Sequence, residues 1–267
     1  MVSVFSVVKN FAIILVCALL LCCGCAHTQY DLPTTAHANT DPFLIIFVDA
    51  KHLNYNNCSS LLKTILKHPD GSKNRDIGHA WIYLQGTIDG NLVSIEGGHS
   101  GELGITQAKY FDGIMNYLEY GYSNPTPAQM ISPRYEPNPI KYLWEPLNDG
   151  FFQEGAGKHK PTFAVKINLN QEQFQQIYRY VTNCYDYSHY ALGGNQCSSF
   201  VAQVAALAGV YLESEITISV PSSMWFNGMH VRLWEDPAYR TLTFSSPDIL
   251  EKSMREASSK GHKGQGT

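Results

Sequence analysis

The sequence lacks an excess of positive charge and lacks closely spaced pairs of Cys or His outside its first segment, which are features of nucleic-acid and zinc sites. Charged residues make up 16% of the 267 residues and the formal net charge is −4, so no basic excess indicates a nucleic-acid or anionic-surface partner. Beyond the first 25 residues no Cys-x-x-Cys or His-x-x-x-His pair occurs, which argues against zinc. We therefore expect no metal and no cofactor, although five side chains are conceivable ligands: His52, His68, His79, His99 and Cys197.

Two catalytic motifs are also missing. The Gly97-Gly98 pair is not followed by the Lys-Ser/Thr pair that a phosphate-binding loop needs. No Gly-x-Ser-x-Gly elbow occurs, and His99-Ser100-Gly101 lacks its leading half. The sequence therefore argues against a phosphate-loop nucleotide site and against a serine nucleophile of this type.

Cysteine is scarce outside the first segment, where four of the seven lie. Only Cys58, Cys184 and Cys197 remain in the rest of the chain. An odd number in an exported protein suggests one disulfide and one free thiol. A Cys58–Cys184 bond with Cys197 free is one possibility and three free thiols are the other, because the spacing does not choose between them.

The first 25 residues have the features of a targeting segment. Lys9 is the only charge before an apolar run from Phe11 to Leu21, and Cys22-Cys23-Gly24-Cys25 follows. The Gly-Cys pair resembles the lipobox of bacterial lipoproteins, which implies lipidation of Cys25, although Cys22 stands where Leu is usual. An uncleaved anchor, for which the run is short, and a plain secretory signal are the alternatives. All three place the rest of the chain across a membrane.

The rest of the chain divides by composition. Residues 26–42 are polar and contain two prolines, which is typical of a flexible tether. Residues 43–255 can bury one sizeable core, and we expect a single domain there. Within it, residues 120–161 show no periodicity, which favours an insertion or lid. Residues 256–267 predict a disordered tail.

Apolar periodicity predicts both strands and helices in residues 43–255. The spacing predicts strands at 43–48, 78–85, 92–96 and 162–169, helices at 57–68, 106–119, 171–181 and 197–208, and a last short helix from Pro247. The Asp89-Gly90-Asn91 turn joins the second and third strands into a hairpin, and 97–104 is predicted as a glycine-rich loop. The fold class is therefore α+β, with a mostly antiparallel sheet and a helix that carries Cys197.

Cys197 is the strongest candidate for a functional residue. The run Gly193-Gly194-Asn195-Gln196-Cys197 leads directly into an apolar helical stripe. The thiol is therefore expected at a helix N-terminus, where unpaired N–H groups and the helix dipole stabilise a thiolate. The alternative is that Cys197 is a small buried hydrophobic residue at the start of a helix.

A cysteine nucleophile needs a base, and the base needs an orienting partner. His79 opens the first strand of the hairpin and is the candidate base, and Glu96, which closes the next strand, is the candidate partner. His99, three residues later, is the alternative third residue. The alternative for His79 is a histidine of the core or of the sheet edge whose hydrogen bonds are satisfied within the fold. The alternative for Glu96 is a solvent-exposed residue at the end of a strand.

These segments carry a resemblance to a family. Gly78–Leu84, Ser94–Glu96 and Asn195–Val201 together resemble the permuted papain-like cysteine hydrolases of the NlpC-type superfamily, in the YiiX-like and lecithin:retinol acyltransferase-like branch. That branch has the His strand before the Cys helix. The resemblance implies a circularly permuted papain-like fold, catalysis by Cys197, His79 and Glu96, and a cell-wall peptide or lipid acyl substrate. Gln196 separates Asn195 from Cys197, where the family commonly has Asn directly before Cys.

The sequence therefore predicts an exported, membrane-tethered cysteine hydrolase that cleaves an amide or ester bond through a thioester. We expect it in the bacterial cell envelope, held to the membrane by a lipid anchor, with its domain outside the cytoplasm. The expected partners are the membrane and the substrate, and no nucleic acid. The alternative is a non-catalytic envelope lipoprotein that uses the same fold as a binding module.

Overall fold

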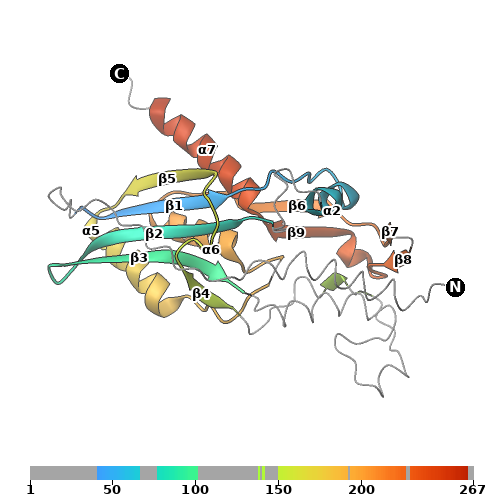
Figure 1. Cartoon of the computed structure of the whole chain (residues 1–267), viewed down its shortest axis with the longest axis horizontal. Helices are drawn as coiled ribbons and strands as arrows, with labels where there is room; N and C mark the ends of the chain where they lie inside the picture. Colours follow the sequence, from blue (N-terminus) through green and yellow to red (C-terminus); the bar gives the residue numbers. More distant parts are fainter. Residues whose placement is uncertain are drawn as a thin grey trace, which may run out of the picture.

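The computed structural model describes residues 41–66, 77–101, 138, 140–141, 150–191, 193–226 and 229–263. Its main feature is a five-stranded sheet in the order β4-β3-β2-β1-β5, with every neighbouring pair antiparallel (Figure 1). The strands are β1 (Phe43–Asp49), β2 (His79–Ile88), β3 (Asn91–Ser100), β4 (Phe151–Glu154) and β5 (Phe163–Asn168).

Alternation along the central strands gives the sheet two different faces. One face carries the fully buried aliphatic residues of β1 and β2, namely Leu44, Ile46, Val48, Ala80, Ile82 and Leu84. The opposite face carries aromatic pairs, in which Phe47 stacks on Trp81 and Phe43 on Tyr83 with ring centroids 5.2 and 5.9 Å apart. The register Phe47↔Trp81 and Asp49↔His79 therefore places His79 on the aromatic face.

Helices cover the aliphatic face. α5 (Gln171–Arg179) continues into a π-helical turn (Tyr180–Cys184), and α6 (Cys197–Leu207) contributes Phe200, Val201 and Val204 to the same core as β1 and β2. Both helices lie behind the sheet in Figure 1, whereas the connection from β4 to β5 crosses its front. The C-terminal helix α7 (Pro247–Lys263) packs along β1 and β5.

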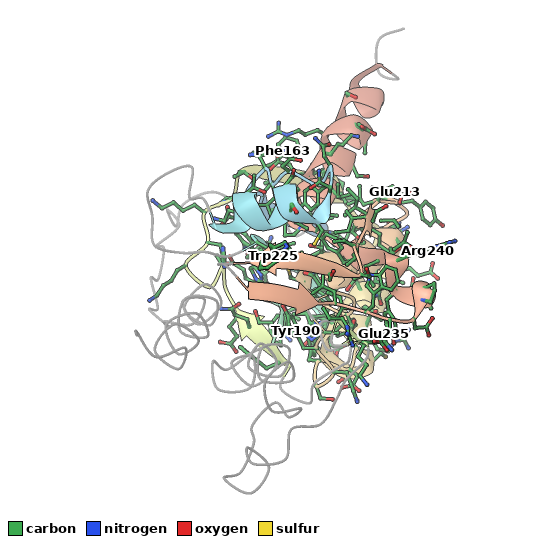
Figure 2. All side chains as sticks on the ribbon, turned by 90° about the vertical axis from the view of Figure 1, so that its right-hand side faces the viewer. Phe163, Tyr190, Glu213, Trp225, Glu235 and Arg240 are labelled. Atoms are coloured by element: carbon green, nitrogen blue, oxygen red, sulfur yellow. The ribbon has the colours of Figure 1, made fainter. Side chains whose placement is uncertain are left out.

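A smaller part of the fold lies beyond one end of the sheet. It consists of α2 (Cys58–Leu66), a pair β6 (Glu215–Ser219) with β9 (Thr241–Ser245), and a pair β7 (Ser223–Phe226) with β8 (Met229–Arg232). Figure 2 looks onto this end. A second core fills it, formed by Leu61, Ile140, Ile218, Val220, Leu233 and Leu242.

The structure confirms the α+β class and the mostly antiparallel sheet. The hairpin, the strands at residues 43 and 163, and the helices beginning near Cys58, Gln171, Cys197 and Pro247 also match the predictions. Asn170 caps α5, because its side chain accepts the Gln173 N–H at 2.8 Å.

Three boundaries differ from the predictions. Residues 97–100 continue β3 and are not a loop, since Gly98 is held against Gln153 of β4. Residues 151–154 belong to the sheet as β4, so the predicted insertion does not extend over them. α7 runs to Lys263, so the predicted tail from 256 begins inside a helix.

Some predictions fall on residues outside the described ranges. These are the signal segment 1–25, almost all of the tether 26–42, the helix at 106–119 and most of the predicted lid. Within the described part of the chain, no helix has the length and apolarity needed to span a bilayer.

Candidate functional site

Cys197 is the first residue of α6, as the sequence predicted. The helix starts there because Gln196 is extended, with φ −146° and ψ −172°, and acts as the N-cap. The Gln196 N–H donates to Ser199 Oγ at 2.9 Å, and its side-chain amide donates to the carbonyl of Ser245 at 2.5 Å. The cap is thus the buried Gln196, and Ser199 supports it from the first turn.

The sulfur of Cys197 is buried but lies among polar groups. Its S–H donates to Gln196 Oε1 at 3.0 Å, and Ser198 Oγ lies 3.9 Å away. Burial raises the pKa of the thiol to about 11, while the backbone N–H groups of Ala80, Ser198 and Cys197 itself hydrogen-bond the sulfur and lower the pKa. The thiol therefore keeps its proton at neutral pH, although three N–H groups converge where a negative charge would form.

His79 is equally buried, on the aromatic face of β2. Its ring stacks on Trp81 at 5.9 Å and on His159 at 4.8 Å between centroids. Its Nε2 atom is buried and has no hydrogen-bond partner. Burial lowers the pKa of His79 to about 3, so the ring is neutral at physiological pH.

The two predicted partners are neighbours without being in contact. The β2–β3 ladder ends at Ile82↔Gly97, and the N–H of Ala80, one residue after His79, hydrogen-bonds the sulfur. The Ala80 side chain faces α6, however, and the His79 ring lies on the other face with Trp81. The structure therefore brings Cys197 beside the backbone of His79 but not beside its imidazole.

Glu96 does not reach His79. It is exposed and lies opposite Tyr83, four residues along β2 from His79. The register instead places Asp49 opposite His79. The orienting role predicted for Glu96 therefore has no support in this geometry.

His99, the predicted alternative, lies on the face covered by α6. It is fully buried, and its Nε2–H donates to the carbonyl of Tyr187 at 3.0 Å. The Tyr185 hydroxyl lies 2.9 Å from His99 Nδ1 and 2.8 Å from Asn195 Oδ1. Since that hydroxyl has one proton, it can serve only one of the two acceptors while His99 is neutral. His99 is thus linked to the loop that precedes Cys197.

Two ionisable residues next to His79 were missed from the sequence. Asp49 ends β1, and His159 lies in the β4–β5 connection. Asp49 Oδ2 accepts from His159 Nδ1 at 2.8 Å and from Lys51 Nζ at 2.9 Å. Burial raises the pKa of Asp49, but these two hydrogen bonds outweigh it, so the net shift is downward. Only a known β1–β2 register would have pointed to Asp49.

No metal site or disulfide emerges from the described ranges. Within them, no group of three His, Cys, Asp or Glu side chains is arranged to hold a metal ion. Cys58, Cys184 and Cys197 are all free thiols, so the described structure corresponds to the second of the two cysteine arrangements.

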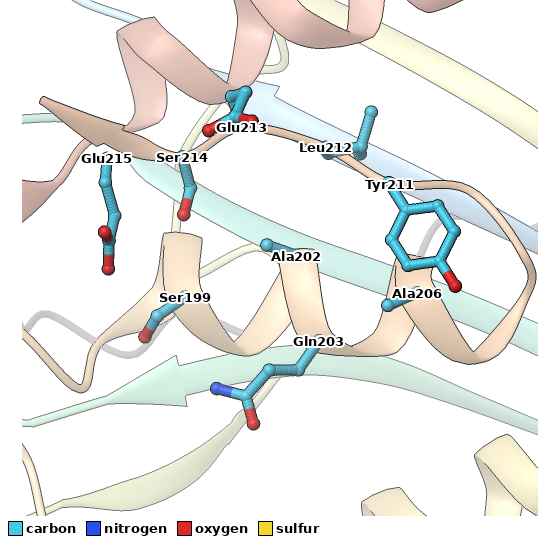
Figure 3. A pocket seen from close by; sticks show the side chains of 9 residues that line it. All are labelled: Ser199, Ala202, Gln203, Ala206, Tyr211, Leu212, Glu213, Ser214 and Glu215. Atoms are coloured by element: carbon cyan, nitrogen blue, oxygen red, sulfur yellow. The ribbon is translucent and has the colours of Figure 1, made fainter.

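A groove of about 360 Å³ lies beside α6 (Figure 3). Ser199, Ala202, Gln203 and Ala206 of the helix form one side of it, and residues 211–215 form the other. Cys197 is not among the lining residues, so this groove does not give access to the sulfur.

Comparison of the chain with protein-family models, curated proteins and solved structures found no match. The arrangement of Cys197, His79, His99 and Asp49 therefore has to be interpreted from its own chemistry.

Because His79 and His99 are buried, we expect the folded protein to lose stability in acid. The folded pKa values of His79 and His99 are lowered, to about 3 and about 4, mainly by burial. In the unfolded chain the pKa of each histidine is near 6.5, so below that pH the unfolded state takes up a proton that the folded state does not. The free energy of unfolding should therefore fall by about 1.4 kcal/mol per pH unit for each histidine, until the pH reaches the pKa of the folded state.

Thermal unfolding followed by circular dichroism between pH 7 and pH 5 measures this slope. His79→Gln and His99→Gln should each flatten it, whereas His189→Gln, at an exposed histidine, should not. Equal slopes for all four proteins would contradict this assignment.

Proposed function

We propose that this protein is an exported, membrane-tethered cysteine hydrolase that cleaves an amide or ester bond through a thioester on Cys197. The observation that carries the proposal is the site of the sulfur at the first residue of α6. The backbone N–H groups of Ala80, Cys197 and Ser198 point at the sulfur. Such groups stabilise a thiolate and, near a bound carbonyl, an oxyanion.

His79 is the proposed base. Its Nε2 atom is buried and has no hydrogen-bond partner, and its backbone adjoins Ala80, whose N–H holds the sulfur. Because the ring lies on the other face of β2, the reaction requires it to move toward the sulfur when substrate binds. Catalytic hydrogen bonds are often long before the substrate complex forms.

The proposed reaction balances within the site. His79 takes the Cys197 proton as the sulfur attacks the carbonyl carbon, and N–H groups at the start of α6 hold the oxyanion. Collapse breaks the amide or ester bond, and the leaving amine or alcohol takes the proton from His79. Water then attacks the thioester, with His79 accepting one of its protons, and the acid is released as Cys197 regains a proton.

The remaining features of the proposal come from the sequence. The resemblance to permuted papain-like hydrolases supports a papain-like arrangement of the sheet and α6, and a cell-wall peptide or lipid acyl substrate. The Gly24-Cys25 pair after the apolar run supports lipidation of Cys25 and a site in the bacterial cell envelope, outside the cytoplasm.

A second function is favoured by a specific observation. The Cys197 thiol is buried with a raised pKa, and no hydrogen bond joins it to His79. A non-catalytic envelope lipoprotein that uses this fold for binding needs neither an ionised thiol nor a mobile imidazole.

The formation of a cleaved product distinguishes the hydrolase from the binding module. Incubation of the protein from residue 26 onward with muropeptides and with a short-chain acyl ester, followed by mass spectrometry, should give a cleaved product from one of them. A product from muropeptides identifies an amidase or peptidase, and one from the ester identifies an acyl hydrolase. If neither substrate is cleaved faster than by Cys197→Ala, the binding module is the better account.

A further inference from the structure

A cluster of ionisable side chains lies beside His79 on the face of the sheet away from α6. Asp49 and His159 are joined by the 2.8 Å bond from Nδ1 to Oδ2, and the His159 ring stacks on the His79 ring at 4.8 Å. The side chains of Asp49 and His159 are only 8% and 11% exposed. The carboxylate and two imidazoles thus form a nearly dry group that ends at the unpaired His79 Nε2.

The chain holds His159 in this place at a conformational cost. Gly155, Gly157 and Lys158 all have positive φ, of 67°, 56° and 71°, and for Lys158 this conformation is unfavourable. The connection is anchored on both sides, because the Gly155 N–H donates to the Glu96 carbonyl at 3.0 Å and the Thr162 N–H to the Val48 carbonyl at 2.8 Å. It crosses the front of the sheet in Figure 1.

We infer that Asp49 and His159 are positioning residues for His79, in the role that the sequence suggested for Glu96. The inference rests on the proposed function. In the resting structure His159 packs against the imidazole, and the Asp49 carboxylate holds His159 through Nδ1. The pair thereby sets the place from which the ring moves toward the sulfur, and the negative charge of Asp49 favours the proton that His79 gains.

The charges around His79 act with opposite signs. The Asp49 carboxylate raises the pKa of His79, while His159 and His99 lower it, and burial lowers it most. Lys51 bonds the same Asp49 oxygen and offsets part of the negative charge. Removing Asp49 and removing His159 should therefore move the titration of His79 in opposite directions.

The test variants are Asp49→Asn and His159→Gln. The matched controls are Asp186→Asn and His189→Gln, because Asp186 and His189 form a similar pair at 2.6 Å on the surface. Asp49→Asn should lower kcat/KM by at least about tenfold and shift its acid limb to lower pH. His159→Gln should shift the acid limb to higher pH. The control variants should match the wild type. A merely structural role would lower the rate without moving the limb, which would overturn the inference.

A second readout does not depend on turnover. The ring 13C and 15N resonances of His79, followed over the pH range in which the fold persists, should titrate lower in Asp49→Asn and higher in His159→Gln. If these shifts occur in a protein that cleaves no substrate, the coupling stands and the proposed hydrolase fails. If the protein cleaves substrate and His79 titrates alike in all variants, the hydrolase stands and this inference is wrong.

Discussion

Replacing Cys197 by alanine should reduce hydrolysis by about 10⁴-fold or more, because the variant lacks the atom that forms the thioester. The fold should survive, since the substitution removes a single buried sulfur atom and leaves the Gln196 cap of α6 in place. Cys197→Ser should be nearly as inactive, because a hydroxyl at this place is a much weaker nucleophile. The rate of product formation on the cleaved substrate measures both.

Cys184→Ala is the matched control for this prediction. Cys184 is an exposed free thiol at the end of the π-helical turn, and its loss should leave the rate within about twofold of the wild type, as surface substitutions usually do. A Cys197→Ala protein that retains more than a tenth of the activity would show that another group carries the reaction.

Asp248→Ala should lower the free energy of unfolding by about 3 kcal/mol. The Asp248 carboxylate at the start of α7 accepts the backbone N–H groups of Lys51, His52 and Leu53 at 2.7, 2.9 and 2.7 Å. It also accepts the Tyr55 hydroxyl at 2.8 Å. Its removal leaves these donors without their acceptor and deprives the helix N-terminus of a favourable negative charge.

The expected change in thermal midpoint is a fall of about 6–12 °C for a domain of this size. Asp236→Ala is the control, because Asp236 accepts a single backbone N–H, from Ala238 at 2.9 Å, at an exposed turn. A midpoint for Asp248→Ala within 2 °C of the control would contradict the account. Since the anchored segment follows directly on Asp49, we also expect this variant to lose activity.

The sequence predicted the Cys197 element well because the signal is local. Glycines and Asn195 precede the thiol and an apolar stripe follows it, so the start of a helix could be placed to the residue. The choice of Gln196 as the cap was missed, because its amide is satisfied by the carbonyl of Ser245, almost fifty residues away. A long-range acceptor of this kind leaves no local pattern.

The separation of Glu96 from His79 can be worked out from the sequence. A two-residue hairpin loop at Asp89-Gly90 fixes Ile88 opposite Asn91, and the same register places Glu96 opposite Tyr83. The turn signal is local, but the pairing that it implies separates Glu96 from His79 only when it is counted along both strands.

Asp49 and His159 could not have been found in the same way. Their contact depends on which strand lies beside β2, and β1 is separated from β2 by α2 and an undescribed stretch. It also depends on how the β4–β5 connection folds over the sheet, since the two residues are 110 positions apart in the sequence. Residue type and spacing carry no information on either point.

The most direct test of the account is to look for the acyl group on the sulfur. The protein is mixed with an excess of an activated short-chain acyl ester, quenched in acid, and analysed by intact and peptide mass spectrometry. The account predicts one acyl group on the peptide that contains Cys197, removable by hydroxylamine, absent from Cys197→Ala and accumulating more slowly in His79→Ala. Turnover with no adduct, or an adduct on another residue that forms equally in Cys197→Ala, would contradict it.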